Sequence, residues 1–584
     1  MELKPFPTGV DNFEKMINQG YYYVDKTLFI KEFIDKKSEV SVFTRPRRFG
    51  KSLNISMLQY YFENMKADKA TIFAGLKIMD AGDKYHEHQS KYPVIKMSLK
   101  GGEGSNFRKA FDRLKIEIGS EFRRHQYLLR SDKLDDKEKQ LYQYIIDESA
   151  PLPTEKKTDE QQDENTREIE REKQLVAYSS SLKFLSTCLE RYYNKKVVIL
   201  IDEYDVPLEK AHFRGFYADM IDFLRSFFHD ALKTNDSLSF AVLTGCLRVS
   251  KESIFTGLNN LDIISIVSNK YSEYFGFTEA EMSEALVYYE LEDKEDEARD
   301  WYNGYLFGDT TVYNPWSSIR YLSDMRENEP FPKPHWANTS SNTIIRELID
   351  IADQETKDEI EHLIAGGTIT KPIQEDIVYA EIMDSIDNLW NFLFFTGYLK
   401  KVSKSQHEED TYLEVKIPNR EIRYIYNRHI GKWFGNLVKK ADRTKLHAAV
   451  ISGDTETFAE QMNHFLLEII SYLDNAENFY HGFLAGILSS IPGCVVKSNR
   501  ETGFGRTDLY IKPLSVRKQA IIIEIKIADD ITKLEIAAEK AMVQINEKKY
   551  AEELRPEGYR DFLKYGVAFF SKECEVVKDT QWID

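Results

Sequence analysis

Short apolar runs alternate with longer amphipathic stretches along the N-terminal part of the chain. The runs are rich in β-branched residues, and the stretches between them repeat apolar positions at helical spacing. The runs lie at residues 41–44, 93–99, 197–202, 238–244 and 263–267. Apolar strands that alternate with helices are typical of a parallel sheet covered on both faces. The pattern predicts an α/β domain, which we place at residues 1–280.

The region 281–440 has a mostly helical pattern and is rich in aromatic residues. Its densest apolar run, at 389–399, predicts a buried helix, and a strand or hairpin is expected near 412–417. A helix followed by a hairpin could form a small winged-helix-like unit. We interpret the aromatic motifs WYNGY (301–305) and YNPWS (313–317) as packing elements.

The region 441–584 begins with two helical stretches and then changes to strand patterns. Strands are expected at 507–513 and 519–526, a helix at 532–553, and a last buried strand at 565–571. This order predicts a second compact α/β module at the C-terminal end of the sequence.

A strongly charged segment interrupts the first domain. Residues 154–173 contain a single hydrophobic residue, Ile169. Such a composition is typical of a solvated linker or an exposed helix. We therefore predict a charged insertion near residues 130–175, between the second and third strands of the sheet.

The overall composition restricts the classes of function. The net charge of −17 does not favour nucleic-acid binding by the whole surface, so such binding needs a local basic site or metal ions. The four cysteines are scattered without a CxxC pair, which argues against a disulfide framework or a zinc knuckle. No apolar run approaches the roughly 20 residues of a membrane span. We expect a cytoplasmic protein without a membrane partner; homo-oligomerisation is left open.

Two carboxylates and a lysine in the C-terminal module suggest chemistry. Asp508 lies on one expected strand, while Glu524 and Lys526 are two apart on the next and project from the same face. Pairing of the two strands could bring Asp508 beside Glu524. Two close carboxylates repel each other unless a divalent cation lies between them, and Mg²⁺ or Mn²⁺ prefers oxygen ligands. The set therefore predicts metal-assisted hydrolysis of a phosphodiester, with Lys526 orienting water or stabilising the phosphate.

Helical residues could support this site. Glu477 and His481 are four residues apart, as are Gln544 and Lys548, so each pair shares a helix face. The alternative is a salt bridge between Glu524 and Lys526 on an exposed strand face, but a carboxylate inside the run IIIEIK would be costly to bury without a partner.

With these residues the chain resembles the PD-(D/E)XK nuclease superfamily over roughly residues 470–571. The order of a helical glutamate, GRTDL (505–509), EIK (524–526) and QINEKKY (544–550) carries the resemblance. It implies a restriction-endonuclease-like α/β fold with catalytic roles for Asp508, Glu524, Lys526, Gln544 and Glu477.

A second constellation follows the first expected strand. A P-loop reads GxxxxGK[ST] after a strand, and RPRRFGKS (45–52) retains the second half of that pattern. Arg45 replaces the first glycine. Backbone N–H groups and the start of the following helix could still bind phosphate. Candidate ligands of ATP are Arg47, Arg48, Gly50, Lys51 and Ser52.

The strand VVILID, which ends in Asp202 and Glu203, strengthens this interpretation. Asp202 would hold Mg²⁺ with help from Ser52, and Glu203 would polarise the attacking water. Thr244, at the end of the next strand, is placed like a sensor residue, and Arg248 could contact phosphate. The alternative for the acidic strand end is a pair of solvated carboxylates.

With these motifs most of the chain resembles the bacterial AAA-ATPase-like family, which is often fused to a PD-(D/E)XK domain. The carrying segments are RPRRFGKS, the DEYD strand end, LTGCLRVSKESIFTGLNNL (243–261), WYNGY and YNPWS. The resemblance implies a P-loop NTPase (AAA/ASCE-like) parallel-sheet domain, a helical middle region and a nuclease-like domain. It also implies that an arginine at the first glycine position is usual in the family.

We therefore hypothesise a nucleotide-controlled, Mg²⁺-dependent nuclease that acts on nucleic acid, with DNA as the expected substrate. The resemblance alone suggests bacterial defence or mobile-element biology. One alternative is an ATP-binding signalling or scaffold protein, a STAND-like switch. In that case its nuclease-like domain would only bind a partner or nucleic acid.

Overall fold

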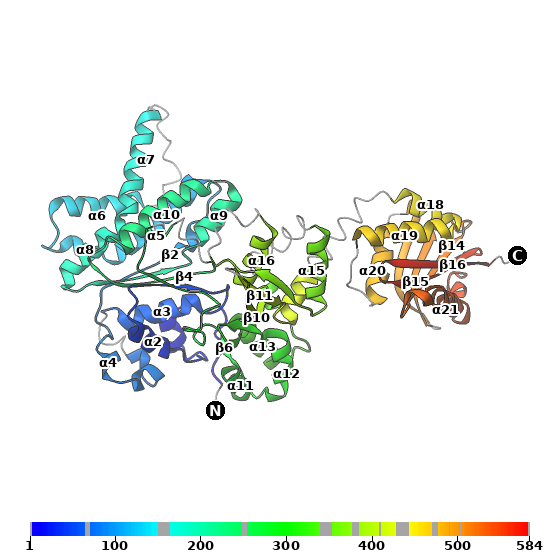
Figure 1. Ribbon diagram of the computed structural model, residues 1–584, viewed down its shortest axis with the longest axis horizontal. Coiled ribbons are helices and arrows are strands. Elements are labelled where there is room, and N and C mark those ends of the chain that lie inside the picture. Colours follow the sequence, from blue (N-terminus) through cyan, green and yellow to red (C-terminus); the bar gives the residue numbers. More distant parts are fainter. Residues whose placement is uncertain are drawn as a thin grey trace. The chain divides into compact units, whose positions relative to one another are not determined.

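The computed structural model divides the chain into two compact units (Figure 1). Unit 1 comprises Met1–Ser341 and Thr370–Tyr424, and unit 2 comprises Asn342–Ile369 and Ile425–Asp584. The division into domains at 1–280, 281–440 and 441–584 stays a prediction. The structure describes all residues except 1–2, 65–70, 150–163, 248–253, 256, 339–352, 376–384, 408–409, 428–442, 470–476, 490, 503–504 and 582–584.

Unit 1 is built around a parallel five-stranded sheet. Its strands run in the order β2-β3-β4-β1-β5. Their bounds are β1 Val40–Thr44, β2 Val94–Ser98, β3 Val197–Asp202, β4 Leu238–Gly245 and β5 Leu261–Ile264. All six residues of β3 are buried, as expected for a central strand covered on both faces. The parallel sheet predicted from the apolar runs is confirmed.

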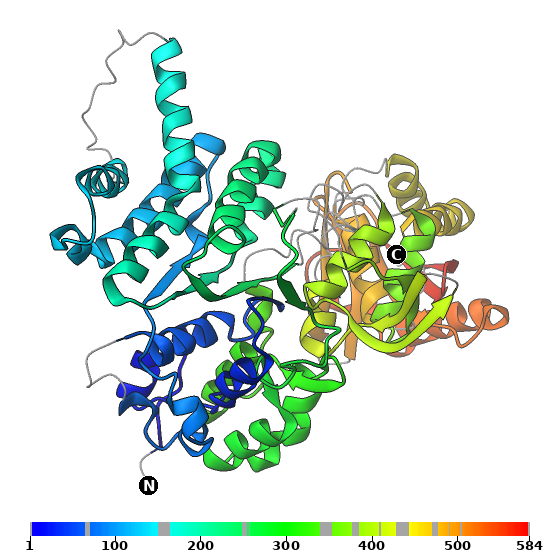
Figure 2. The same ribbon diagram turned by 60° about the vertical axis from the view of Figure 1, so that its left-hand side comes forward.

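Helices cover both faces of this sheet, with α2 and α3 on one face and α5, α8 and α10 on the other (Figures 1 and 2). Helix α7 extends away from the other helices, and it includes the second half of the charged run 154–173. The bounds are α1 Phe13–Asn18, α2 Leu28–Lys36, α3 Lys51–Phe62, α4 Asp83–His86, α5 Phe107–Arg124, α6 Asp136–Glu148, α7 Glu164–Ser179, α8 Ser181–Tyr193, α9 Val206–Arg214 and α10 Tyr217–Leu232.

The middle of the chain contains the expected helices and also two small sheets. The helices are α11 Glu279–Tyr288, α12 Glu295–Tyr302, α13 Pro315–Arg326, α15 Gln354–Ile364 and α16 Ile386–Phe395. One sheet has the order β6-β8-β7 and the other β10-β11-β9. The strands are β6 Phe277–Thr278, β7 Tyr305–Phe307, β8 Thr310–Tyr313, β9 Ile369–Pro372, β10 Lys400–His407 and β11 Asp410–Lys416. The buried helix followed by a hairpin is present; a winged-helix assignment stays a proposal.

Unit 2 contains a five-stranded mixed sheet in the order β12-β13-β14-β15-β16. Only the β14–β15 pair is parallel, and α21 forms the crossover between these two strands. The bounds are α18 Thr444–Ser452, α19 Thr455–Ile469, α20 Glu477–Leu488, β12 Cys494–Thr502, β13 Gly505–Pro513, β14 Ala520–Ile527, α21 Leu534–Glu547, β15 Phe562–Phe570 and β16 Glu573–Gln581. The expected helix at 532–553 is therefore shorter than the sequence suggested, and the edge strands β12 and β16 were not foreseen.

The two faces of this sheet have different partners. Ile521, Ile523 and Ile525 belong to the core that packs on α18, α19 and α20, whereas Ala520 and Ile522 face the α21 side. Helix α21 lies very close to β15, because a Cβ at Gly566 would come within 2.1 Å of the Ala538 carbonyl oxygen. The alternation of β14 therefore directs even-numbered side chains such as Glu524 toward α21.

Within the described residues, no helix is both long enough and apolar enough to cross a bilayer. All four cysteines are free thiols, as the scattered spacing predicted.

Candidate functional site

The loop between β1 and α3 forms the floor of a cavity of about 300 Å³ in unit 1. Gly50 starts α3 in the left-handed conformation, with φ of 80°, so the helix begins directly at the loop. Lys51 is buried, and its Nζ donates to the carbonyl oxygens of Arg45 and Pro46 at 2.8 and 2.9 Å. The lysine thus lies in the hollow of the loop, where its charge could neutralise a phosphate.

Arg45 does not line this cavity. Its guanidinium donates to the carbonyl oxygens of Thr44 and Ile264, both at 2.9 Å, and lies about equally close to the rings of Phe275 and Phe307. Burial lowers the pKa of Arg45 to about 9, which still leaves the side chain charged at neutral pH. The residue that replaces the first P-loop glycine therefore joins the ends of β1 and β5 and is not placed as a phosphate ligand.

The acidic strand end lies beside the loop. Ser52 Oγ donates to Asp202 Oδ2 at 2.6 Å, and the Thr244 hydroxyl donates to the other oxygen of Asp202. Glu203 borders the cavity with a positive φ of 52°, and burial, followed by the charge of Asp202, raises its pKa. The structure therefore brings together Ser52, Asp202, Glu203 and Thr244; Arg248 lies outside the described residues.

The two loop arginines have partners within the chain. Arg47 forms an ion pair with Glu209 at 2.6 Å, and the Arg48 guanidinium lies 4.2 Å from the ring centroid of Trp316. The guanidinium of Arg320, one turn further along α13, lies 5.0 Å from the centroid of the Trp316 ring. Both loop arginines nevertheless line the cavity.

Trp316 and Arg320 are site residues that the sequence interpretation missed. The motif YNPWS was assigned to packing, yet Pro315 and Trp316 line the cavity. Asn314 accepts from the backbone N–H of Ser317, which starts α13 at this point. The available signal in the sequence was Trp316 at the start of a helix that directly follows a strand. Only the fold shows that this helix lies at the loop between β1 and α3.

The lining of the cavity is cationic although the whole chain is acidic. Seven basic and three acidic residues border it. The basic ones are Lys26, Arg47, Arg48, Lys51, Lys100, Lys210 and Arg320, and the acidic ones are Asp11, Glu103 and Glu203. An excess of positive charge at the start of a helix suits an anionic ligand such as a nucleotide phosphate.

In unit 2 the adjacent strands β13 and β14 carry the predicted catalytic set. Leu509 pairs with Ile523, so Asp508 and Glu524 are the next residues along the two strands. Asp508 Oδ2 accepts from the backbone N–H of Ile525 at 2.8 Å, and the Asp508 carbonyl contacts His481 Nε2 at 2.8 Å. The first contact orients the carboxylate of Asp508, and the second fixes the backbone of this residue.

Glu524 is only 2% exposed. Its Oε1 accepts from the Gln544 side-chain amide, which comes from α21, and lies 3.8 Å from Lys526 Nζ. Lys526, near the end of the central strand β14, is partly exposed, so its ammonium can reach a ligand. The exposed salt bridge considered from sequence does not describe this site, because the carboxylate is buried under α21.

Tyr550 is a further residue near this set. Its hydroxyl accepts from Gln544 Nε2 at 3.3 Å. Burial raises the pKa of Tyr550, the hydrogen bond from Gln544 lowers it, and the charges of Glu524 and Asp508 raise it further.

The Glu477 side chain lies outside the described part of the structure. Among the described residues, no group of three or more histidine, cysteine, aspartate or glutamate side chains is arranged so that it could hold a metal ion. The oxygen donors of Asp508 and Glu524 fit a hard divalent cation that keeps several waters.

Comparisons with known proteins find matches for the regions that contain the two sites. Residues 7–255 match the family described as predicted AAA-ATPase, and residues 475–579 match the PD-(D/E)XK nuclease superfamily. The chain is 26% identical over 569 residues to an "uncharacterized protein in vnfD 5'region" of Azotobacter chroococcum mcd 1, covering 96% of this chain and 95% of that protein. The matches support an enzyme of the hydrolase class. The chain thus combines an N-terminal domain of the AAA-ATPase-like family with a C-terminal domain of the PD-(D/E)XK nuclease superfamily.

Proposed function

We propose that this protein is a nucleotide-controlled, Mg²⁺- or Mn²⁺-dependent nuclease that hydrolyses DNA. The observation that carries the proposal is the buried carboxylate of Glu524, held by Gln544 beside Asp508 and Lys526. A carboxylate that is 2% exposed is costly unless its charge is used or compensated. A divalent cation is the compensation that two neighbouring carboxylates suit best.

The chain's own residues would divide the work in unit 2. Asp508 and Glu524 would hold the cation, which would lower the pKa of a bound water and stabilise charge on the phosphate. The Ile525 N–H keeps Asp508 oriented, and the Gln544 amide keeps Glu524 oriented. Lys526, with its partly exposed ammonium, would bind the scissile phosphate or orient the attacking water.

Unit 1 would supply nucleotide binding and control. The start of α3, Lys51 and the arginines that line the cavity would bind the phosphates of ATP, and Ser52 with Asp202 would hold the accompanying Mg²⁺. An unrestrained nuclease would threaten its host genome, so regulation by a nucleotide is physically sensible. ATP can exert it only by favouring one arrangement of the chain over another.

The nuclease proposal is tested by incubating the full chain with a panel of single- and double-stranded DNA, with Mg²⁺ or with a chelator. Asp508→Asn and Glu524→Gln should each abolish metal-dependent cleavage while leaving the circular dichroism spectrum unchanged. Asp579→Asn is the matched control, because this exposed aspartate lies on β16 of the same sheet, away from the set. Full cleavage by Glu524→Gln would remove the site from consideration.

Nucleotide control is tested in the same assay with and without ATP. ATP should change the cleavage rate of the wild type, and Lys51→Ala should remove that change together with ATP binding. Equal rates with and without ATP across all DNA forms would refute the coupling and leave two independent sites on one chain.

A switch that binds ATP without hydrolysing it is a second candidate. It is favoured by the partners of the loop arginines, because Arg47 is paired with Glu209 and Arg48 is stacked on Trp316. The two candidates differ in phosphate release by the wild type. An ATPase releases phosphate, and Glu203→Gln should abolish that turnover. A switch binds ATP in calorimetry, but its wild type releases no phosphate.

A further inference from the structure

A group of tyrosines and lysines gathers where α8 ends and β3 begins. We call it the tyrosine–lysine face and define it as Tyr92, Tyr127, Tyr192, Tyr193, Lys195 and Lys196. Tyr193 is the last residue of α8, and Asn194 ends the helix in the left-handed conformation with φ of 51°. Lys195 and Lys196 then lead into β3, which starts at Val197.

This face lies at the opposite end of the sheet from the nucleotide cavity. Strand β3 begins beside the tyrosine–lysine face and ends at Asp202, which bonds to Ser52 of the P-loop. Six residues of strand span roughly 20 Å. A ligand on the tyrosine–lysine face would therefore be distinct from the nucleotide.

The rings of Tyr127, Tyr192 and Tyr193 form an aromatic cluster. The ring centroids of Tyr127 and Tyr192 are 5.3 Å apart, and those of Tyr192 and Tyr193 are 4.9 Å apart. Tyr192 is 43% exposed and Tyr127 is 36% exposed, which is high for aromatic side chains of this size. Lys195 extends the cluster, because its Nζ lies 4.9 Å from the centroid of the Tyr92 ring.

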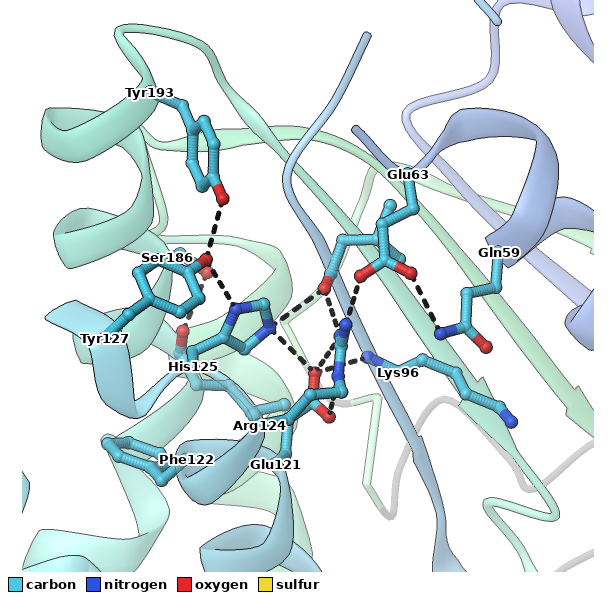
Figure 3. Close-up of polar contacts among 12 residues, drawn as sticks. Gln59, Glu63, Lys96, Glu121, Phe122, Arg124, His125, Tyr127, Ser186 and Tyr193 are labelled. Carbon is cyan, nitrogen blue, oxygen red and sulfur yellow. Dashed lines mark hydrogen bonds and ion pairs between the residues drawn. The ribbon is translucent and has the colours of Figure 1, made fainter. Parts of the chain in front are cut away.

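The hydroxyl groups of Tyr127 and Tyr193 belong to a polar network that continues into the domain (Figure 3). The Tyr193 and Tyr127 hydroxyls are 2.9 Å apart, and the Tyr127 hydroxyl lies 3.0 Å from His125 Nδ1. His125 Nε2 contacts the Val94 carbonyl at 3.2 Å and the Glu121 carboxylate at 3.3 Å.

The network continues through Arg124, which bonds to both Glu121 and Glu63. Since Glu63 immediately follows α3, this network ties the rings to three elements of the domain core. The rings of Tyr127 and Tyr193 are therefore held in place before any ligand arrives, which lowers the conformational entropy lost on binding.

The charge of the tyrosine–lysine face is positive within an acidic chain. Lys91, Arg130, Lys195 and Lys196 are exposed at or near it, and none of the four has an ion pair in the described part of the chain. Arg191 is exposed nearby and is paired with Glu138. Exposed aromatic rings beside cations that form no ion pair suit a polymeric ligand that has flat rings and regularly spaced negative charges.

We propose that the tyrosine–lysine face binds single-stranded nucleic acid, with bases stacked on Tyr192 and Tyr127 and phosphates beside Lys195 and Lys196. Single strands fit better than duplexes because only unpaired bases offer their faces to aromatic side chains. The inference rests on the proposed nuclease function, since it places part of the substrate strand on unit 1. It also explains how a chain of charge −17 could hold a polyanion.

The test measures fluorescence anisotropy of a labelled oligothymidylate of about 20 nucleotides, long enough to cover a site of several stacked bases. The protein is the full chain carrying Glu524→Gln, with a chelator present, so that cleavage does not interfere. Adding Tyr192→Ala should weaken binding by about 5- to 150-fold, the range for loss of one base–aromatic stack. Tyr192→Phe should retain binding, because stacking needs the ring and not the hydroxyl.

Two further variants make the result specific. Tyr424→Ala is the matched control, since Tyr424 belongs to the same unit and is also 43% exposed; it should bind as the parent does. Lys195→Ala should reduce the dependence of log affinity on log salt concentration by about 0.7, as expected for one phosphate contact to a single strand.

The outcomes separate this inference from the nuclease proposal. Tyr192→Ala binding as tightly as the parent, a duplex competing as well as the single strand, or no binding by the parent would each overturn the inference. If the wild type cleaves no DNA but the Tyr192-dependent binding is present, the nuclease proposal fails and the tyrosine–lysine face remains a binding site.

Discussion

Replacing Glu421 by glutamine should remove a pH-dependent loss of stability from unit 1. Glu421 is fully buried, and its carboxylate accepts from the Ser317 hydroxyl at 2.9 Å and from the Trp336 N–H at 2.8 Å. Burial, opposed by these hydrogen bonds, raises the pKa of Glu421 from 4.5 to about 7. The side chain thus holds a proton near neutral pH that it would release in the unfolded chain.

The magnitude follows from the two pKa values. Because the folded form binds the proton more tightly, the free energy of unfolding falls as the pH rises from about 4.5 to about 7. The shift corresponds to about 3 kcal/mol in total. For a unit of roughly 400 residues, the entropy of unfolding converts this into a change of about 4 °C in Tm.

The assay is calorimetric unfolding of the wild type and of Glu421→Gln at a pH of about 5 and of about 8, on either side of the folded pKa. Glutamine keeps an acceptor oxygen for Trp336 and can donate its amide to Ser317. The two proteins should melt together at the lower pH, and the variant should melt about 4 °C higher at the upper pH. Glu87→Gln, at an exposed position of the same unit, is the control and should show no such divergence. A difference in Tm between wild type and Glu421→Gln that is the same at both pH values would refute the reasoning.

Two other substitutions test the loop between β1 and α3 and the cavity beside it. Arg45→Leu should lower the stability of unit 1 by at least about 3 kcal/mol, because two buried carbonyl oxygens lose a charged donor. Thermal unfolding measures this change. An unchanged Tm together with a loss of ATP binding would instead make Arg45 a ligand. ATP should change the tryptophan fluorescence of the wild type, since the Trp316 indole contacts Arg48 at the cavity, and Trp316→Phe should abolish that change. An equal signal from Trp316→Phe would place the responding indole elsewhere.

The parallel sheet could be predicted because its strands are buried on both faces and therefore read as continuous apolar runs. Strand β3 is the clearest example, since all its residues are buried and the strand ends at Asp202. Strands β12 and β16 could not be predicted in the same way. They lie at the two edges of the unit 2 sheet, where burial is partial and the apolar pattern is correspondingly weak; Val495 of β12 is 43% exposed.

The candidate sites were partly visible from local spacing. Glu524 and Lys526 are two residues apart on one strand, and Gln544 lies on the helix that follows. Trp316 and Arg320 are separated from Arg48 by more than 260 residues of sequence, and no local pattern connects them. The role of Arg45 was also hidden, because its carbonyl partner Ile264 belongs to a strand that only the sheet order places beside β1.

The division of the chain has a consequence for its synthesis. The polypeptide passes from unit 1 to unit 2 after Ser341, returns at Thr370 and leaves again after Tyr424. A ribosome therefore releases the first part of unit 2 before it has finished unit 1, so neither unit can complete its fold as a simple N-terminal domain. Glu421 and its partner Ser317 come from the two separate stretches of unit 1, and their contact can form only when the second stretch has emerged. A single proteolytic cut in any one of these three connections would leave the units joined by the other two.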